Sequence, residues 1–189
     1  MIYMEQDINS YEIDIVSVDE LTDYLNKSLE AWGRPSTADY TVFQPIVELR
    51  LDIVETHANH IAKTDDSLLP YCTMVMPYHR RQAVWELIRN AIKTLRTYHS
   101  GTHPDVEEAL DNLPHQSWPD SLPIPTEYRE YIILSYAYVW REYNMKAEYV
   151  AGNILNIAYS SRNNYRKNAL KTIAQRILDW NDAIRATKK

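Results

Sequence analysis

The chain has 189 residues, of which 45% are apolar and 24% charged, and its formal charge is −6 at pH 7. This apolar fraction excludes disorder as the default state, a single cysteine excludes a disulfide framework, and no apolar run reaches the length of a transmembrane helix. Three glycines leave little room for glycine-rich phosphate loops or tight β-hairpins. The first twelve residues lack the basic start of a signal peptide.

Apolar residues recur at helical spacing along most of the chain. Ser17 is the expected N-cap of the first helix, with Glu20 completing a capping box, and the apolar stripe ends at Trp32 before Gly33. Pro45 suits the first turn of a second helix. The pattern predicts further helices over residues 45–63, 80–99, 104–113, 126–143, 147–158 and 165–184.

The non-helical candidates are few. Residues 11–15 and 70–77 are the only segments that fit short strands or extended arms. Four prolines within residues 114–125 predict an ordered connector. The sequence therefore predicts a mainly α fold: one domain over residues 1–189, a bundle of six to seven helices with at most two short strands or arms.

Charge is unevenly distributed along the chain. Residues 1–60 hold three basic and twelve acidic residues, whereas residues 126–189 hold eleven basic and six acidic ones. Such asymmetry indicates partners rather than fold. It fits a basic end that contacts nucleic acid, or an acidic part of one subunit that meets the basic part of the next and closes a ring. Chance clustering on a solvated surface is the third explanation.

Tyrosine is the clearest compositional bias, with 15 Tyr against one Phe. Tyrosine combines a large contact area with a polar tip and is enriched at partly wet interfaces, although it also serves in cores when its hydroxyl is bonded. The tyrosines after residue 127 fall on more than one helical face, which favours the interface. The predicted subunit or partner interface residues are Tyr128, Tyr131, Tyr136, Tyr138, Tyr143, Arg162, Tyr165 and Arg166.

Patterns for catalysis or metal binding are weak. His57 and His60 have a spacing at which two ligands can share a metal, but no further ligands follow at metal-site spacing. Cys72, in an apolar run, is more typical of a small buried hydrophobe than of a nucleophile. Arg50 and His57 faintly resemble the arginine–histidine pair of helical HEPN ribonucleases, which lies on one helix face. We expect no enzyme, no catalytic residue, no metal and no cofactor.

The segment 148–173 resembles a helix-turn-helix. Its second helix would place Arg162, Asn163, Arg166 and Lys167 against phosphates and base edges. The turn is one residue longer than usual, and a basic, solvated helix face explains the same residues. This segment supports the alternative function, a helical nucleic-acid-binding regulatory protein.

Two regions together resemble a known family. Residues 17–62 hold a capped helix ending Trp32-Gly33-Arg34-Pro35, a polar link and a long apolar helix. Residues 125–158 begin Pro125-Thr126-Glu127-Tyr128 and continue as an Ala/Tyr-rich helix and a further helix. This layout resembles the head-to-tail adaptor (tail tube adaptor, or connector) proteins of short-tailed bacteriophages, with the difference that residues 80–113 are predicted as helix where such proteins often carry more β structure.

The resemblance implies a virion structural protein that assembles in the host cytoplasm and carries no catalytic residues. Copies of the chain would form a ring, a dodecamer, that joins the portal to the tail and surrounds the DNA exit channel. The implied partners are the chain itself, the portal protein, the tail proteins, and genomic DNA that passes through without sequence-specific contact. No membrane partner is expected.

Overall fold

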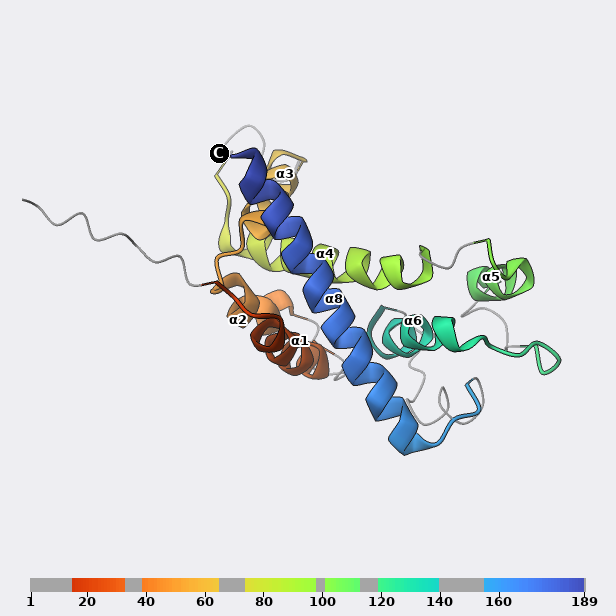
Figure 1. The fold of residues 1–189 in the computed structure, drawn as a ribbon. Helices are drawn as coiled ribbons and strands as arrows, with labels where there is room; N and C mark the ends of the chain where they lie inside the picture. The colour runs from red at the N-terminus through yellow and green to blue at the C-terminus, as the bar shows by residue number, and fades with distance from the viewer. Residues whose placement is uncertain are drawn as a thin grey trace, which may run out of the picture.

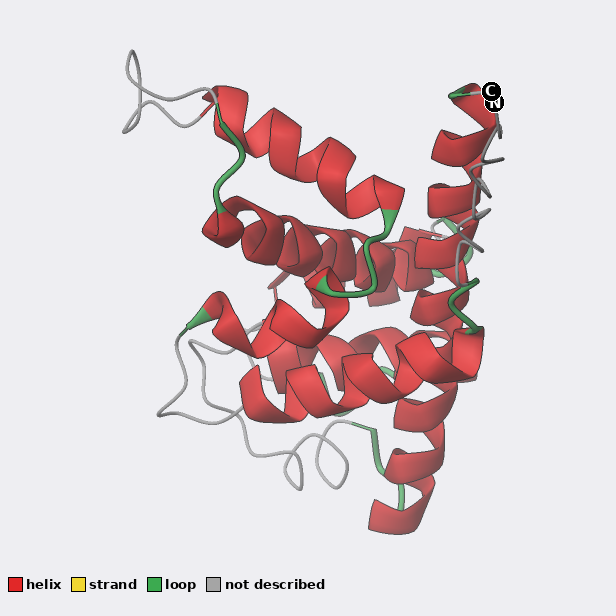
Figure 2. Ribbon diagram, turned by 90° about the vertical axis from the view of Figure 1, so that its left-hand side faces the viewer, coloured by secondary structure: helices red, strands yellow, loops and turns green. Residues whose placement is uncertain are grey.

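A computed structural model of the chain describes residues 15–32, 39–64, 74–97, 101–112, 119–139 and 155–188. Within these ranges the protein consists of helices and their connections, with no strand, which confirms the mainly α fold (Figure 2). No helix among them is both long and apolar enough to cross a membrane. Residues 11–14 and 70–73 of the two predicted arms and residues 114–118 of the proline-rich connector lie outside the described residues. The second arm ends earlier than predicted, because Pro77 is already the first residue of a helix, Pro77–Thr97.

The longest helix, α8, crosses the molecule and packs against α1, α3, α4 and α6 (Figure 1). Seen from the side, it stands along one edge of the other helices (Figure 2). The elements in chain order are α1 Val18–Trp32, the 3-10 helix η1 Tyr40–Phe43, α2 Gln44–Val47, α3 Asp52–Thr64, α4 Pro77–Thr97, α5 Pro104–Asn112, the 3-10 helix η2 Thr126–Tyr128, α6 Arg129–Leu134, the π-helical turn η3 Ser135–Val139, and α8 Tyr159–Thr187.

Helix α1 begins and ends where the sequence predicts. The backbone N–H of Glu20 donates to Ser17 Oγ at 3.2 Å, which satisfies one of the unpaired donors of the first turn. Leu21, Leu25 and Leu29, spaced by four residues, are fully buried. A local cap and an apolar stripe of period 3.6 therefore suffice to position this helix.

The helix predicted over 45–63 is broken in the structure. α2 ends at Val47, Arg50 adopts a left-handed φ of 52°, and α3 begins at Asp52. The backbone N–H of Ile53 donates to Asn181 Oδ1 of α8 at 3.2 Å, in a buried position. A side chain 128 residues away thus satisfies a first-turn donor of α3, and no local pattern could have indicated that contact.

Removing this long-range cap is expected to destabilise the protein. Asn181→Ala leaves the Ile53 N–H buried without its acceptor, so the free energy of unfolding should fall by about 1–3 kcal/mol. Urea unfolding at 25 °C measures the loss. Asp182→Ala, at the exposed neighbouring position of α8, is the matched control and should change stability by about 0.5 kcal/mol at most. Equal losses in the two variants would contradict a capping role.

Two cations at the end of α8 hold the first turn of α3. Asp52 Oδ2 accepts from Arg185 Nε at 2.8 Å, and Asp52 Oδ1 accepts from Lys188 Nζ at 2.6 Å. The hydrogen bond from Lys188 and then that from Arg185 lower the pKa of Asp52 from its ordinary value of 3.8. The C-terminal end of the chain is therefore tied to its N-terminal half.

The two ion pairs of Asp52 predict that the stability of the fold depends on pH. A carboxyl whose pKa is lower in the folded protein stabilises the fold above its unfolded pKa of 3.8, and the contribution disappears as the pH falls through the folded value. The wild-type free energy of unfolding should therefore fall more steeply on acidification than that of Asp52→Asn, and the two curves should converge at the acid end. Denaturant unfolding between about pH 6 and pH 2 tests this; parallel curves would contradict it, and Asp182→Asn serves as the control.

Candidate functional site

The first twenty residues of α8, 159–178, carry five Lys or Arg side chains and no acid. On the side that faces solvent, exposed polar residues follow each other at intervals of three or four positions. Four of them form what we call the α8 outer stripe: Asn164, Asn168, Thr172 and Gln175. At 1.5 Å per residue this row is about 17 Å long.

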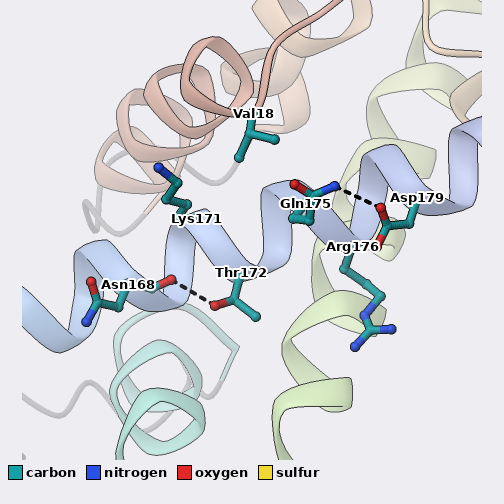
Figure 3. Close-up of a pocket in the computed structure, with 7 residues that line it drawn as sticks. All are labelled: Val18, Asn168, Lys171, Thr172, Gln175, Arg176 and Asp179. Atoms are coloured by element: carbon teal, nitrogen blue, oxygen red, sulfur yellow. Dashed lines mark hydrogen bonds between the residues drawn. The ribbon is translucent and has the colours of Figure 1, made fainter.

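The outer stripe borders an open groove of about 510 Å³ between α8 and the start of α1. Val18 comes from α1, and the other lining residues come from α8 (Figure 3). Thr172 Oγ1 donates to the Asn168 carbonyl at 3.0 Å, and Gln175 Nε2 donates to Asp179 Oδ1 at 2.8 Å. These contacts hold two of the stripe's side chains along the helix, so the groove wall is a preformed polar surface.

Acids of α1 pair with two of the cations of α8. Lys171 extends toward α1 (Figure 3), and its Nζ lies 3.1 Å from Asp19 Oδ1. Arg166 Nη2 lies 3.2 Å from Glu30 Oε1. With the Asp52 pairs, these contacts join the acidic N-terminal part to the basic C-terminal part inside one protomer, so some of the charge that the asymmetry assigns to a neighbouring subunit is already paired.

The residues predicted to contact nucleic acid divide into two groups. Asn163 and Lys167 are exposed on the first turns of α8, as a recognition helix requires. Arg162 is half-buried, and the side chain of Arg166 is only 13% exposed, with Nε donating to the Tyr138 hydroxyl at 2.7 Å. The expectation that Arg166 lies on the surface and contacts nucleic acid is therefore corrected: its side chain joins α8 to η3 and α1. The first helix of the predicted motif, 148–154, lies outside the described residues.

Four predicted interface tyrosines lie in the protomer's own core. Their exposed fractions are 7% or less, which corrects the expected surface position of Tyr128, Tyr131, Tyr136 and Tyr138. The Tyr128 hydroxyl donates to Glu107 Oε1 at 2.8 Å, and burial together with that bond raises its pKa to about 12. Tyr165 is half-buried and its hydroxyl accepts from Arg129 Nη1 at 2.9 Å. Tyr143 lies outside the described residues.

The residues of the weak catalytic and metal-binding patterns do not form a common site in the described part of the chain. Arg50 lies in the break before α3 and is exposed, so it does not share a helix face with His57. His57 is half-buried on α3, and desolvation lowers its pKa. In the described part of the chain, no group of three or more His, Cys, Asp or Glu side chains could hold a metal ion. Cys72 lies outside that part.

The sequence pointed to the start of α8 but missed how far the surface continues. The absence of acids over residues 159–178 and the spacing of Asn168, Thr172 and Gln175 are the signals that could have found it. The surface is open, polar and carried by one rigid helix, which suits contact with a macromolecule. Comparison of the chain with family models, with curated proteins and with solved structures finds no match.

Proposed function

We propose that the protein is a virion structural protein: a ring-forming adaptor that joins the portal to the tail and surrounds the DNA exit channel. The observation that supports this most is the α8 outer stripe, an exposed polar row about 17 Å long on a 29-residue helix. A helix of this length offers a rigid wall to a macromolecule that lies or slides along it. Assembly in the host cytoplasm and residence in the virion belong to the same proposal.

A ring requires two different surfaces of the chain that fit each other. α1 exposes Glu20 and Asp23 on the side away from its buried leucines, and α4 exposes Arg89 and Lys93. These oppositely charged faces belong to different helices, so one can meet the other on the next copy. We assign the head-to-tail contact to this pair of faces.

Native mass measurement over a range of protein concentrations tests the ring. Twelve copies of a 22.2 kDa chain give a particle of about 270 kDa. Arg89→Glu with Lys93→Glu should break it into protomers, and adding Glu20→Lys with Asp23→Lys in the same chain should restore it. A mass that stays at one or two chains at every concentration contradicts ring formation, and an unchanged ring in the first variant contradicts the assigned faces.

A second candidate function is a nucleic-acid-binding regulatory protein. The observation in its favour is that α8 begins at Tyr159, so that Asn163 and Lys167 lie exposed where a recognition helix would start. A regulator should select one sequence from random duplexes, by roughly 10³-fold or more over non-specific DNA. Asn163→Ala with Lys167→Ala should then remove the selection. Recovery of no sequence preference would reject this candidate.

A further inference from the structure

We propose that the α8 outer stripe is a contact surface for the phosphate backbone of duplex DNA, and that Asp19 and Glu30 of α1 keep this contact weak by pairing with the cations of α8. This inference rests on the proposed function, because it assigns the surface that meets the DNA in the channel. It concerns the strength of that contact, which the ring itself does not determine.

The stripe has the chemistry that phosphates bind. Amide side chains such as those of Asn164 and Asn168 donate hydrogen bonds to phosphate oxygens without reading sequence. Lys167 and Lys171 stand beside this row, and both are exposed. A row of about 17 Å spans roughly five base pairs along a duplex axis. The partner that fits a long polar row flanked by cations is thus a regular polyanion.

The acids of α1 compete for the same cations. The Lys171 and Asp19 side chains are 65% and 86% exposed, and an ion pair this open to water is easily exchanged. Arg166 is held more firmly, because Glu30 and the Tyr138 hydroxyl both accept its hydrogen bonds. Asp19, 3.1 Å from Lys171 Nζ, also adds a negative charge beside the stripe, which repels phosphate. DNA therefore meets the exposed amides of Asn164 and Asn168, the exposed cation of Lys167, and a Lys171 that is already paired with Asp19.

The consequence is a measurable salt dependence. Each cation that neutralises a phosphate makes the slope of log affinity against log salt concentration more negative by about 0.9. On the wild-type surface Lys167 has no acidic partner among the described residues, and Lys171 is shared with Asp19, so the slope should be about −1 to −2 per protomer. Such a contact guides DNA without arresting it.

Fluorescence anisotropy with a labelled 25-base-pair duplex of arbitrary sequence, in about 20–200 mM KCl, tests the proposal on the full chain. Asp19→Asn with Glu30→Gln should bind several-fold more tightly at low salt, with a slope steeper by up to about 1, because Lys171 is released while Arg166 stays bonded to Tyr138. Asp105→Asn with Glu108→Gln is the matched control: it removes the same charge from exposed positions of α5, which lies far from the stripe (Figure 1), and should bind like the wild type. Lys167→Gln with Lys171→Gln should abolish binding.

Two results would overturn the proposal: equal affinities for the two acid-removing variants, or wild-type binding by the lysine variant. Thermal unfolding of each variant checks that the fold is intact. The ring is measured separately by native mass. If no ring forms but the variants bind DNA in the predicted order, only the adaptor function is contradicted. If a 270 kDa ring (about twelve chains) forms but its DNA affinity does not change when Asp19 and Glu30 are neutralised, only this inference is contradicted.

Discussion

Phe43→Ala is expected to lower the free energy of unfolding by about 3–5 kcal/mol. Phe43 is the only phenylalanine in the chain and is fully buried. Its ring lies 5.7 Å from that of Trp85, in a stacked arrangement, and 5.3 Å from that of Trp32. Trp32 and Trp85 also contact each other, with ring centroids 4.8 Å apart. Truncation therefore removes one ring of a three-ring cluster that joins α1, η1 and α4, and leaves a cavity beside two large rings that already pack against each other.

Urea unfolding followed by far-UV circular dichroism measures this loss. Phe43→Leu keeps most of the volume and should cost clearly less than the alanine variant, because the cavity that remains is small. Tryptophan emission supplies a second reading, since Trp32 and Trp85 both contact the deleted ring. A loss below about 1 kcal/mol in Phe43→Ala would mean that the cluster repacks, and would remove its role as the joint between these helices.

Arg96→Met is expected to cost about 3 kcal/mol, because it leaves a carboxylate with little access to water and without its cation. Arg96 of α4 binds Glu107 Oε2 at 2.5 Å and Asp111 Oδ1 at 2.8 Å, both on α5. The side chains of Arg96 and Glu107 are 22% and 17% exposed. Burial works against the charged guanidinium, but its hydrogen bonds to the two carboxylates and to Tyr131 raise the pKa of Arg96 above its ordinary value.

The stability of the double variant separates the ion pair from simple packing. Methionine keeps much of the apolar stem of Arg96, so the cost of Arg96→Met comes mainly from Glu107, which loses its cation and keeps the hydrogen bond from the Tyr128 hydroxyl. Adding Glu107→Gln removes that charge and should recover part of the loss. Chemical denaturation of the two single variants and the double variant gives the coupling. Strictly additive losses would contradict an interaction between the two side chains.

Local signals predicted several elements well. Ser17 and the leucines that follow give both the cap and the buried face of α1, and Pro104 starts α5 where the sequence indicates. The period from Tyr165 to Ile184 predicts the buried face of α8, and the helix continues through Ser160 and Ser161 without a break. These features depend on side chains within one or two turns of each other, which a single sequence contains.

The break between α2 and α3 depends on a distant contact. Residues on both sides of Arg50 keep a helical apolar pattern, so periodicity favours one helix. The chain instead turns at Arg50, and Asn181 of α8 takes the hydrogen bond of the Ile53 N–H. Only the approach of α8 decides this, because it supplies the acceptor that a continuous helix would otherwise provide.

In the candidate site, too, the sequence predicts some features, whereas others depend on contacts with distant residues. Lys167 and Asn163 are exposed as predicted, whereas Arg166 is drawn inward by Tyr138 and Glu30. The charge of Arg166 is visible in the sequence, but its pairing with residues 28 and 136 positions away is not.

By itself, the sequence determined the helical class, the bounds of α1 and α5, and the run of α8 that carries cations but no acid. Only the tertiary structure decided which tyrosines face inward, where α3 begins, and which cations of α8 are already paired. The physical reason is the sequence distance over which each interaction acts. Helix propensity, helix caps and the spacing of apolar residues involve only a few neighbouring residues. Burial and charge pairing depend on which helix lies opposite, and that is settled only when α1, α3, α4 and α6 pack against α8.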